Sequence, residues 1–436
     1  MIAAGDVKKT IGRYLLADGM DIIVDLKKSK GSWLVDHRNG DRYLDCFAMF
    51  ASMAVGFNHD SLLEMKDTFG GLAIQKTANS DSYSEPMAEF VQTFHKYAMP
   101  SHLPHLFLIE GGALAVENAL KAAFDWKVKK NFARGAKKEI GSKIIHFRQA
   151  FHGRSGYTLS LTNTADPRKT RYFPKFGWPR IINPKLTFPL TAETLAAVER
   201  IEQQAIADIK KYITEESNDI AGLIIEPIQG EGGDNHFRNV FLKSLRAICD
   251  EHEILLIFDE VQTGVGLTGK FWAYQHFDAP PDIISFGKKT QVCGIIASSR
   301  LDEAESSVFT ESSRINSTFG GNLIDMVRCT AILKIIDRDN LVNNACDRGQ
   351  ELLQGLEDLS NEFPDLISNS RGRGLMCAFD LRDGPSRDSF RRKLLSEKLL
   401  VVGCGEKSIR FRPHLIINKE EIQLILRIIR KVAAHH

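Results

Sequence analysis

Ile254-Leu255-Leu256-Ile257-Phe258-Asp259 and Asp282-Ile283-Ile284-Ser285-Phe286-Gly287-Lys288 are two apolar runs that each lead to a charged residue. Unbroken apolar runs of this length are typical of strands buried on both faces of a parallel sheet. The carboxyl ends of such strands meet at one edge of the sheet, and ligands bind in the crevice beyond it. We therefore expect Asp259 and Lys288 to lie at the same site.

An amine and a carboxylate at one site are what pyridoxal phosphate (PLP) requires of a protein. The lysine amine forms a Schiff base with the cofactor, and the carboxylate keeps the pyridine nitrogen protonated so that the ring accepts electrons. The pair alone leaves a plainer interpretation open, because strand-ending Asp residues and solvated loop lysines are common in α/β proteins.

A nucleotide-binding motif competes with this interpretation. The segment Gly264-Val265-Gly266-Leu267-Thr268-Gly269-Lys270 matches a phosphate-binding loop up to its last position, where the Ser or Thr that ligates magnesium is replaced by Phe271. In nucleotide hydrolases the acidic motif also lies on a different strand from this loop, whereas here both would follow strand 254–258. The sequence therefore argues against a nucleotide hydrolase.

The rest of the chain predicts an α/β fold in two parts. Short apolar runs alternate with amphipathic helices between residues 60 and 330, which predicts a large domain with a mostly parallel sheet covered by helices on both faces. Residues 331–436 predict a smaller α+β domain, which the N-terminal segment 1–59 is expected to join. The candidate strands are 21–26, 33–45, 105–109, 143–147, 221–226, 254–258, 282–286, 294–298, 375–381, 399–402 and 409–412.

Two further segments carry groups suited to an anionic, aromatic ligand. Gly111-Gly112-Ala113 follows strand 105–109 and opens a helix, where free N–H groups and the helix dipole favour a phosphate. Phe151-His152-Gly153-Arg154 follows strand 143–147; Phe151 could stack on a ring, and Arg154 could hold a carboxylate through two hydrogen bonds. A tight turn, a core phenylalanine and a surface arginine are the plainer alternatives.

Composition narrows the class of protein. The 436 residues include 57 basic and 55 acidic side chains, so the net charge is +2 and no basic stripe indicates nucleic acid. No apolar run approaches the length of a membrane span, and no secretory leader is recognised. The seven cysteines are scattered without a Cys-x-x-Cys pair. We therefore expect a cytoplasmic protein with no metal site and no membrane or nucleic-acid partner.

Taken together, these motifs resemble the class III, fold-type I PLP aminotransferases over nearly the whole chain. The likeness rests on Leu44-Asp45, Phe151-His152-Gly153-Arg154, Glu226-Pro227-Ile228-Gln229-Gly230-Glu231-Gly232-Gly233, Phe258-Asp259-Glu260-Val261-Gln262-Thr263-Gly264, Phe286-Gly287-Lys288, Thr318-Phe319-Gly320-Gly321-Asn322, Arg371-Gly372-Arg373-Gly374-Leu375 and Arg410-Phe411-Arg412-Pro413. Within the class, Glu110 to Asn118, Asn79 to Ser84 and Lys288 to Gly294 look most like the lysine 6-aminotransferases. His414 departs from the family pattern, which usually has proline there.

The resemblance implies a role for each candidate site residue. Lys288 and Asp259 would be catalytic, with Lys288 as the Schiff-base lysine rather than its neighbour Lys289. Cofactor binding is implied for Gly112, Ala113, Phe151, Val261, Gln262 and Thr318, the last reaching the cofactor of the other subunit in a homodimer with shared active sites. Substrate binding is implied for Arg154, Glu231, Arg410 and Gln262, with Glu231 neutralising Arg410 when lysine is bound.

The implied reaction moves the ε-amino group of L-lysine to 2-oxoglutarate, and it yields 2-aminoadipate 6-semialdehyde and L-glutamate. One alternative is a class III aminotransferase for another ω-amine, such as ornithine, GABA or a diamine. A PLP racemase or aminomutase, and a non-catalytic PLP-binding protein, are further alternatives. One methylene changes discrimination by only about 1–3 kcal/mol, so the sequence leaves lysine and ornithine unresolved.

Overall fold

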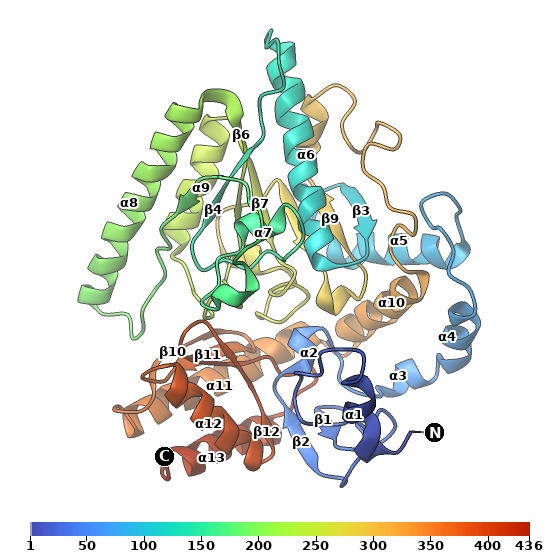
Figure 1. Cartoon of the computed structure of the whole chain (residues 1–436), viewed down its shortest axis with the longest axis vertical. Helices are drawn as coiled ribbons and strands as arrows, with labels where there is room; N and C mark the ends of the chain where they lie inside the picture. The colour runs from blue at the N-terminus through green and yellow to red at the C-terminus, as the bar shows by residue number, and fades with distance from the viewer. Residues whose placement is uncertain (1) are drawn as a thin grey trace.

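The computed structural model describes residues 2–436. Figure 1 shows a larger upper part built around one sheet and a lower part that contains both ends of the chain. The upper sheet has seven strands and lies among long helices, and the lower part contains a four-stranded and a three-stranded sheet.

The seven-stranded sheet has the order β3-β9-β8-β7-β6-β4-β5. Strand β9 is antiparallel to β3 and β8, and the remaining neighbours are parallel. The prediction of an α/β fold with a mostly parallel sheet is therefore confirmed. The strands are β3 (His105–Ile109), β4 (Lys143–Phe147), β5 (Arg180–Ile181), β6 (Ile220–Ile225), β7 (Leu255–Asp259), β8 (Ile283–Phe286) and β9 (Cys293–Ala297).

Both faces of this sheet are buried, which explains the unbroken apolar runs. On β7, Leu255 and Ile257 belong to one hydrophobic cluster, whereas Leu256 and Phe258 belong to another on the opposite face. Helix α6 (Gly112–Ala133) supplies much of the first cluster. The second cluster includes residues of α5 (Glu85–Ala98), α8 (Ala192–Glu216), α9 (Asn239–Glu251) and α10 (Leu323–Arg338).

The lower part joins the two ends of the chain. Strand β2 (Arg42–Asp45) lies between β1 (Trp33–Val35) and β12 (Leu399–Leu400), so the N-terminal segment and the C-terminal segment share a sheet. The four-stranded sheet has the order β10-β11-β14-β13. Its elements and the helices around it are α11 (Leu341–Glu362), β10 (Ser368–Arg373), β11 (Met376–Asp380), α12 (Gly384–Ser396), β13 (Val402–Cys404), β14 (Ser408–Phe411) and α13 (Lys419–Ala433).

One of the predicted strands is absent from the structure. Residues 21–26 form no strand, and only Val24 makes an isolated bridge, because the Asp25 side chain accepts from the Lys27 and Lys28 N–H groups and turns the chain. The predicted end of the large domain at residue 330 falls inside helix α10. The division into 1–59, 60–330 and 331–436 stays a prediction.

Helix α2 (Ala48–Ala51) is a left-handed turn. Its four residues have φ values from +44° to +62°, a region that costs L-residues roughly 1–2 kcal/mol each. Contacts from the lysine-bearing loop hold the turn in place: Lys289 Nζ donates to Ala51 O (3.3 Å), and Gln291 Nε2 donates to Ser52 O (2.8 Å). The remaining short helices are α1 (Val7–Ile11), α3 (Asp60–Leu63), α4 (Lys66–Ala73) and α7 (Thr158–Leu161).

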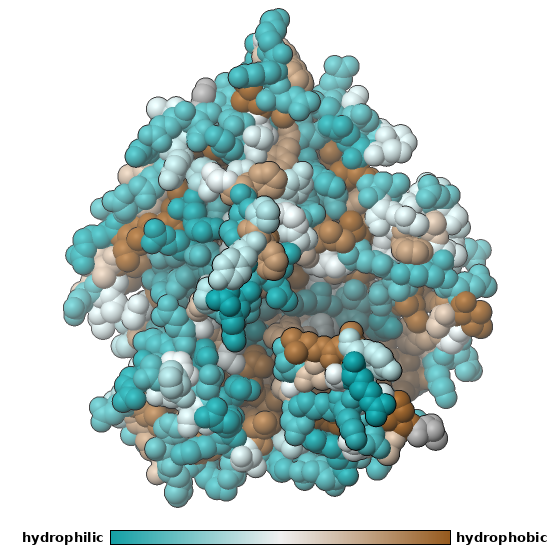
Figure 2. Space-filling view, viewed as in Figure 1, coloured by the Kyte–Doolittle hydropathy of each residue, from teal (hydrophilic) through white to brown (hydrophobic). Residues whose placement is uncertain are grey.

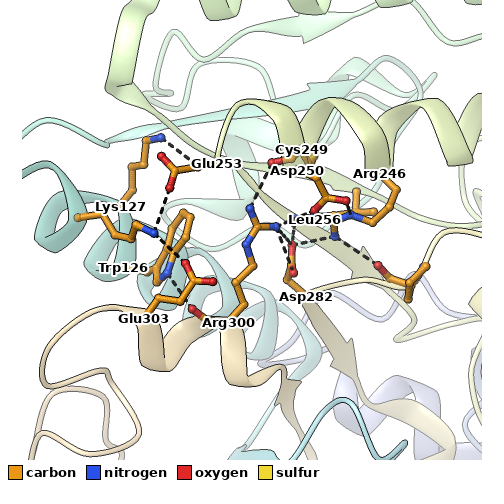
Figure 3. Close-up of polar contacts among 12 residues, drawn as sticks. Trp126, Lys127, Arg246, Cys249, Asp250, Glu253, Leu256, Asp282, Arg300 and Glu303 are labelled. Carbon is orange, nitrogen blue, oxygen red and sulfur yellow. Dashed lines mark hydrogen bonds and ion pairs between the residues drawn. The ribbon is translucent and has the colours of Figure 1, made fainter.

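A network of hydrogen bonds and ion pairs lies at the amino ends of β7 and β8 (Figure 3). The buried Asp282 carboxylate accepts from Leu256 N (2.8 Å), Arg246 Nη1 (2.9 Å) and Arg300 Nη1 (3.3 Å). Asp250 binds the same two arginines from the surface, with its side chain 60 % exposed. Asp282 therefore joins α9, β7 and the segment after β9.

The surface is mostly hydrophilic on the face seen in Figure 2, with apolar side chains in small separate patches. Within residues 2–436, no helix combines the length and the apolar character that a membrane span needs. The seven cysteines of the described chain are free thiols; Cys346 is exposed and the other six are buried.

Candidate functional site

The carboxyl ends of the parallel strands open into a cavity of about 570 Å³. This is the edge at which the sequence predicts a site. Nine of the predicted site residues line the cavity: Gly112, Ala113, Phe151, Arg154, Glu231, Asp259, Val261, Gln262 and Lys288.

Lys288 follows β8 and faces the cavity with a partly buried side chain. Its φ of +53° is a left-handed conformation, which a non-glycine residue adopts at some energetic cost and which is frequent at functional sites. Desolvation lowers the pKa of the Lys288 ammonium from 10.5 to about 8, although the nearby Asp259 carboxylate opposes this shift. At pH 7 roughly a tenth of this amine is therefore neutral, compared with well under a thousandth for an ordinary exposed lysine.

Lys289 has a different environment from Lys288. Its side chain is buried, and its Nζ donates to Gln262 O (2.9 Å) and Ala51 O (3.3 Å) rather than lining the cavity. Burial and the neighbouring Lys288 charge place the pKa of Lys289 well below its usual value. Of the two adjacent lysines, Lys288 has the geometry of a reacting amine.

Asp259 ends β7 and is held from two sides. His152 Nδ1 donates to Asp259 Oδ2 (2.8 Å), and Val261 N donates to Asp259 Oδ1 (3.1 Å). Both Asp259 and His152 are buried. The buried His152 Nε2 has no hydrogen-bond partner among the described residues. The two contacts fix the carboxylate in one orientation toward the cavity.

Glu226 connects two loops of the cavity. Its carboxylate accepts from Phe151 N (2.9 Å) and Gly230 N (2.9 Å), so it joins the loop after β4 to the loop after β6. Burial raises the pKa of Glu226 to about 7, with a further contribution from the Asp259 charge. Glu226 therefore shapes the wall that carries Phe151.

The start of α6 supplies an anion-binding feature. The first N–H groups of an α-helix have no partner within the helix, and those of Gly112 and Ala113 border the cavity. Gly111 has a φ of +102°, which few other residues adopt. A Cβ atom on Gly112 would lie 2.9 Å from Val261 Cγ1, so glycine allows the helix start and Val261 to approach closely.

Arg410 lies on β14 of the small sheet, directly beside the cavity residue Gln262. Arg410 Nη1 donates to Gln262 Oε1 (3.2 Å), and Arg412 Nη2 donates to the same oxygen (3.3 Å). Arg412 has a buried counterion, Asp234. Arg410 is also buried, but it forms no ion pair within 4 Å with any described residue, and its Nε has no partner.

Glu231 pairs with a residue other than Arg410 in this structure. We expect Glu231 to neutralise Arg410 when lysine is bound, whereas in the structure its Oε1 forms an ion pair with Lys169. Its Oε2 is buried without a hydrogen-bond partner in the described chain. No sequence spacing indicates the contact between Lys169 and Glu231, because Lys169 lies in the irregular segment after β4.

The remaining predicted residues lie at the margins of the site. Arg154 is exposed at the mouth, where it lines both this cavity and a neighbouring one of about 1070 Å³. Thr318 is exposed and does not line the cavity of its own chain. Its expected role toward a partner subunit stays a prediction.

Three residues of the site carry no individual role in the sequence analysis. His152 and Glu226 lie inside family motifs, but the motifs do not predict the contacts of their side chains with Asp259 and Phe151. Lys169 lies in no motif, because the conformation of the loop after β4 decides its contact with Glu231.

Comparisons with known proteins agree with this geometry. Residues 15–433 match the aminotransferase class-III family. The chain is 48% identical over 427 residues to the L-lysine-epsilon aminotransferase of Mycobacterium tuberculosis, covering 97% of this chain and 94% of that one. It is 46% identical over 428 residues to the enzyme of the same name from Streptomyces clavuligerus, covering 97% and 93%.

A solved structure is also similar. The fold matches the lysine aminotransferase from M. tuberculosis in the internal aldimine form with a TM-score of 0.96, 48% sequence identity and 99% coverage of both chains.

Proposed function

Because this chain belongs to the class III aminotransferases, which are PLP-dependent transaminases, we propose that it transfers the ε-amino group of L-lysine to 2-oxoglutarate. The products are 2-aminoadipate 6-semialdehyde and L-glutamate. The names and the 46–48% identity of the lysine-epsilon aminotransferases support lysine as the amino donor. The choice of 2-oxoglutarate rests on the arginine beside the cavity.

The cavity has the groups that PLP needs. A reactive amine, a buried carboxylate held by His152 and the free N–H groups at the start of α6 converge on a space of about 570 Å³. Lys288 would carry the cofactor, Asp259 would face its pyridine nitrogen, and Gly112 with Ala113 would bind its phosphate. Phe151 and Val261 would cover the two faces of its ring.

Bound PLP supplies an electron-accepting ring that stabilises negative charge at the carbon attached to the transferred amine. As a free amine, Lys288 would move the proton of that carbon, since a lysine with a pKa of about 8 exchanges a proton more readily near neutral pH than an exposed lysine does. Gln262 would present its amide nitrogen to the cofactor, because its amide oxygen already accepts from Arg410 and Arg412.

The unpaired Arg410 is the observation that carries the substrate proposal. A buried guanidinium without a counterion is costly, and a substrate carboxylate beside the reacting carbon would relieve that cost. A 2-oxo acid has such a carboxylate, whereas the ε-carbon of lysine does not. Glu231 compensates Arg410 when lysine is bound, and Arg154 holds the distant carboxylate of either substrate.

We also propose a cytoplasmic homodimer in which Thr318 reaches the partner's cofactor. The exposed position of Thr318, away from the cavity of its own chain, supports the shared site. Free thiols suit a reducing compartment.

A single-turnover absorbance titration of the PLP-loaded protein tests the substrate assignment. L-lysine, L-ornithine and 4-aminobutyrate are compared without any 2-oxo acid. We expect lysine to change the cofactor absorbance fastest, and 2-oxoglutarate to restore it. A faster response to ornithine or 4-aminobutyrate contradicts the choice of lysine, and no response to any amine contradicts transamination.

Glu231→Ala tests how the site accommodates two different substrates. Without this carboxylate, Arg410 stays uncompensated when lysine binds, so the lysine half-reaction should slow by about tenfold or more. The glutamate half-reaction should change much less, because the substrate carboxylate itself compensates Arg410. Equal losses in both half-reactions would refute the role of Glu231.

A further inference from the structure

Glu231 pairs with Lys169, and the backbone of the preceding Gly230 lies against Gln262, which accepts a hydrogen bond from Arg410. Glu231 lines the 570 Å³ cavity and also a second cavity of about 590 Å³ that contains Lys169. One carboxylate oxygen pairs with Lys169, whereas the other is buried without a partner in the described chain. The Glu231 backbone is fixed, because Gly405 N donates to Glu231 O (2.8 Å). Any change of partner must therefore come from the side chain.

Arg410 is the second cation, and it contacts the cavity residue Gln262. It is buried, its Nε has no partner, and its hydrogen bond to Gln262 provides no negative charge. Glu231 and Gln262 both line the 570 Å³ cavity, and a Cβ atom on Gly230 would overlap with the Gln262 Oε1 that accepts from Arg410. A movement of the Glu231 side chain from Lys169 to Arg410 would neutralise the arginine and remove it from substrate binding.

The backbone around Lys169 is well defined. Lys169 ends the short 3-10 helix η2 (Pro167–Lys169), which Asp166 caps by accepting from Arg168 N (3.1 Å). The Lys169 N–H donates to Asp166 O (3.3 Å). The Asp166 carboxylate pairs with Arg168, so it does not compete with Glu231 for Lys169.

We propose that Lys169 is a specificity-determining residue that holds Glu231 away from Arg410 and so keeps Arg410 free for the α-carboxylate of the 2-oxo acid. This inference rests on the proposed function of Glu231 and Arg410. The Lys169 and Glu231 side chains are 31 % and 22 % exposed, and such a pair is weak. Its weakness suits the role, because Glu231 must still leave Lys169 when lysine binds.

Binding of glutarate to the PLP-loaded protein tests this proposal by isothermal titration calorimetry. Glutarate has both carboxylates of 2-oxoglutarate but no amine or keto group, so it binds without reacting. Lys169→Met should weaken glutarate binding by about two- to fivefold, which is the range expected for the loss of a partly exposed ion pair. The same substitution should raise the KM for 2-oxoglutarate without raising the KM for lysine.

Arg171→Met is the matched control. It removes the same charge two residues further along the same loop, where the exposed Arg171 lies over the Tyr172 ring and forms no ion pair within 4 Å with any described residue. Glutarate affinity should therefore stay unchanged. A loss equal to that of Lys169→Met would mean that the general positive charge of this loop attracts the ligand, and it would overturn the proposal.

A double variant separates the indirect role from direct contact. In a Glu231→Gln background, Lys169→Met should have no further effect on glutarate binding, because the ion pair is already absent. An undiminished loss in that background would show that Lys169 contacts the ligand itself. Unchanged binding in the single variant would also refute the role of Lys169.

Arg410→Gln distinguishes failure of this inference from failure of the proposed function. If Arg410→Gln weakens glutarate binding and Lys169→Met does not, only the inference about Lys169 is wrong. If Arg410→Gln also leaves glutarate binding unchanged, the assignment of Arg410 to the α-carboxylate is wrong.

Discussion

Burial of Lys288 links its protonation to the stability of the fold. Its ammonium is partly buried, and desolvation lowers its pKa to about 8. Between about pH 8 and 10.5, the unfolded chain holds a proton that the folded chain has released, so stability rises with pH in that range. Below about pH 8 both states are protonated, and the full cost of burying the charge remains.

We therefore expect Lys288→Met to stabilise the PLP-free protein at pH 7 by roughly 1–3 kcal/mol, and this advantage should shrink toward pH 10. Urea denaturation of the PLP-free proteins at both pH values measures it. Lys270→Met, at an exposed position, is the control and should change stability little at either pH. An advantage of the same size at both pH values would contradict the ionisation argument.

At the residue scale, the positions of the buried parallel strands explain which site residues could be predicted from the sequence. Asp259 and Lys288 follow buried parallel strands, so their meeting required only the strands themselves. Arg410 lies on β14 and Gln262 lies in the turn after β7, and no sequence pattern indicates their contact. The pairing of Lys169 with Glu231 depends on an irregular loop, whose conformation no hydrophobic period encodes.

At the scale of secondary structure, the same contrast holds. Strands β3 and β4 have the predicted bounds, because each is a short, largely apolar run with a glycine two residues beyond one end. Helix α12 was missed, although Asp383 caps it by accepting from Ser386 N (2.8 Å) and Pro385 lies in its first turn. Its mean hydropathy is low and only Phe390 and Leu394 are buried, so no clear helical period of apolar residues accompanies the capping residue.

The Asp282 network gives a second stability prediction. Asp282→Ala leaves Leu256 N without its acceptor and two largely buried arginines without their shared buried carboxylate (Figure 3). We expect a loss of about 3 kcal/mol, which urea denaturation measures. Asp250→Ala is the matched control, since it removes an exposed carboxylate from the same arginines and should cost less than about 1 kcal/mol. Similar losses in the two variants would contradict the importance of burial.

At the scale of the whole molecule, the site draws on both parts of the chain. Arg410 comes from the small sheet, whereas Lys288 and Asp259 come from the large one. The N-terminal segment reaches the same region through the left-handed turn of α2, which contacts the loop of Lys288. Composition and motif order could predict the two parts, but they could not predict how these parts meet.

A mixing experiment tests the proposed shared site. The Lys288→Ala and Thr318→Ala variants should each have low activity alone. If Thr318 serves the partner's cofactor, a mixed dimer has one site with both native residues, and mixing should restore part of the activity. Activity that stays at the sum of the separate variants, under conditions where subunits exchange, would contradict the shared site.

The distribution of thiols has a practical consequence for spectroscopy. Burial raises the pKa of the Cys249, Cys329, Cys377 and Cys404 thiols, and Cys46 and Cys293 are buried too, so these six should react slowly with alkylating reagents. Cys346, on α11, is the one exposed thiol within residues 2–436, and Cys293 borders the cavity that PLP would occupy. A maleimide dye should therefore label the native chain at a single position in the small part, without prior removal of other cysteines.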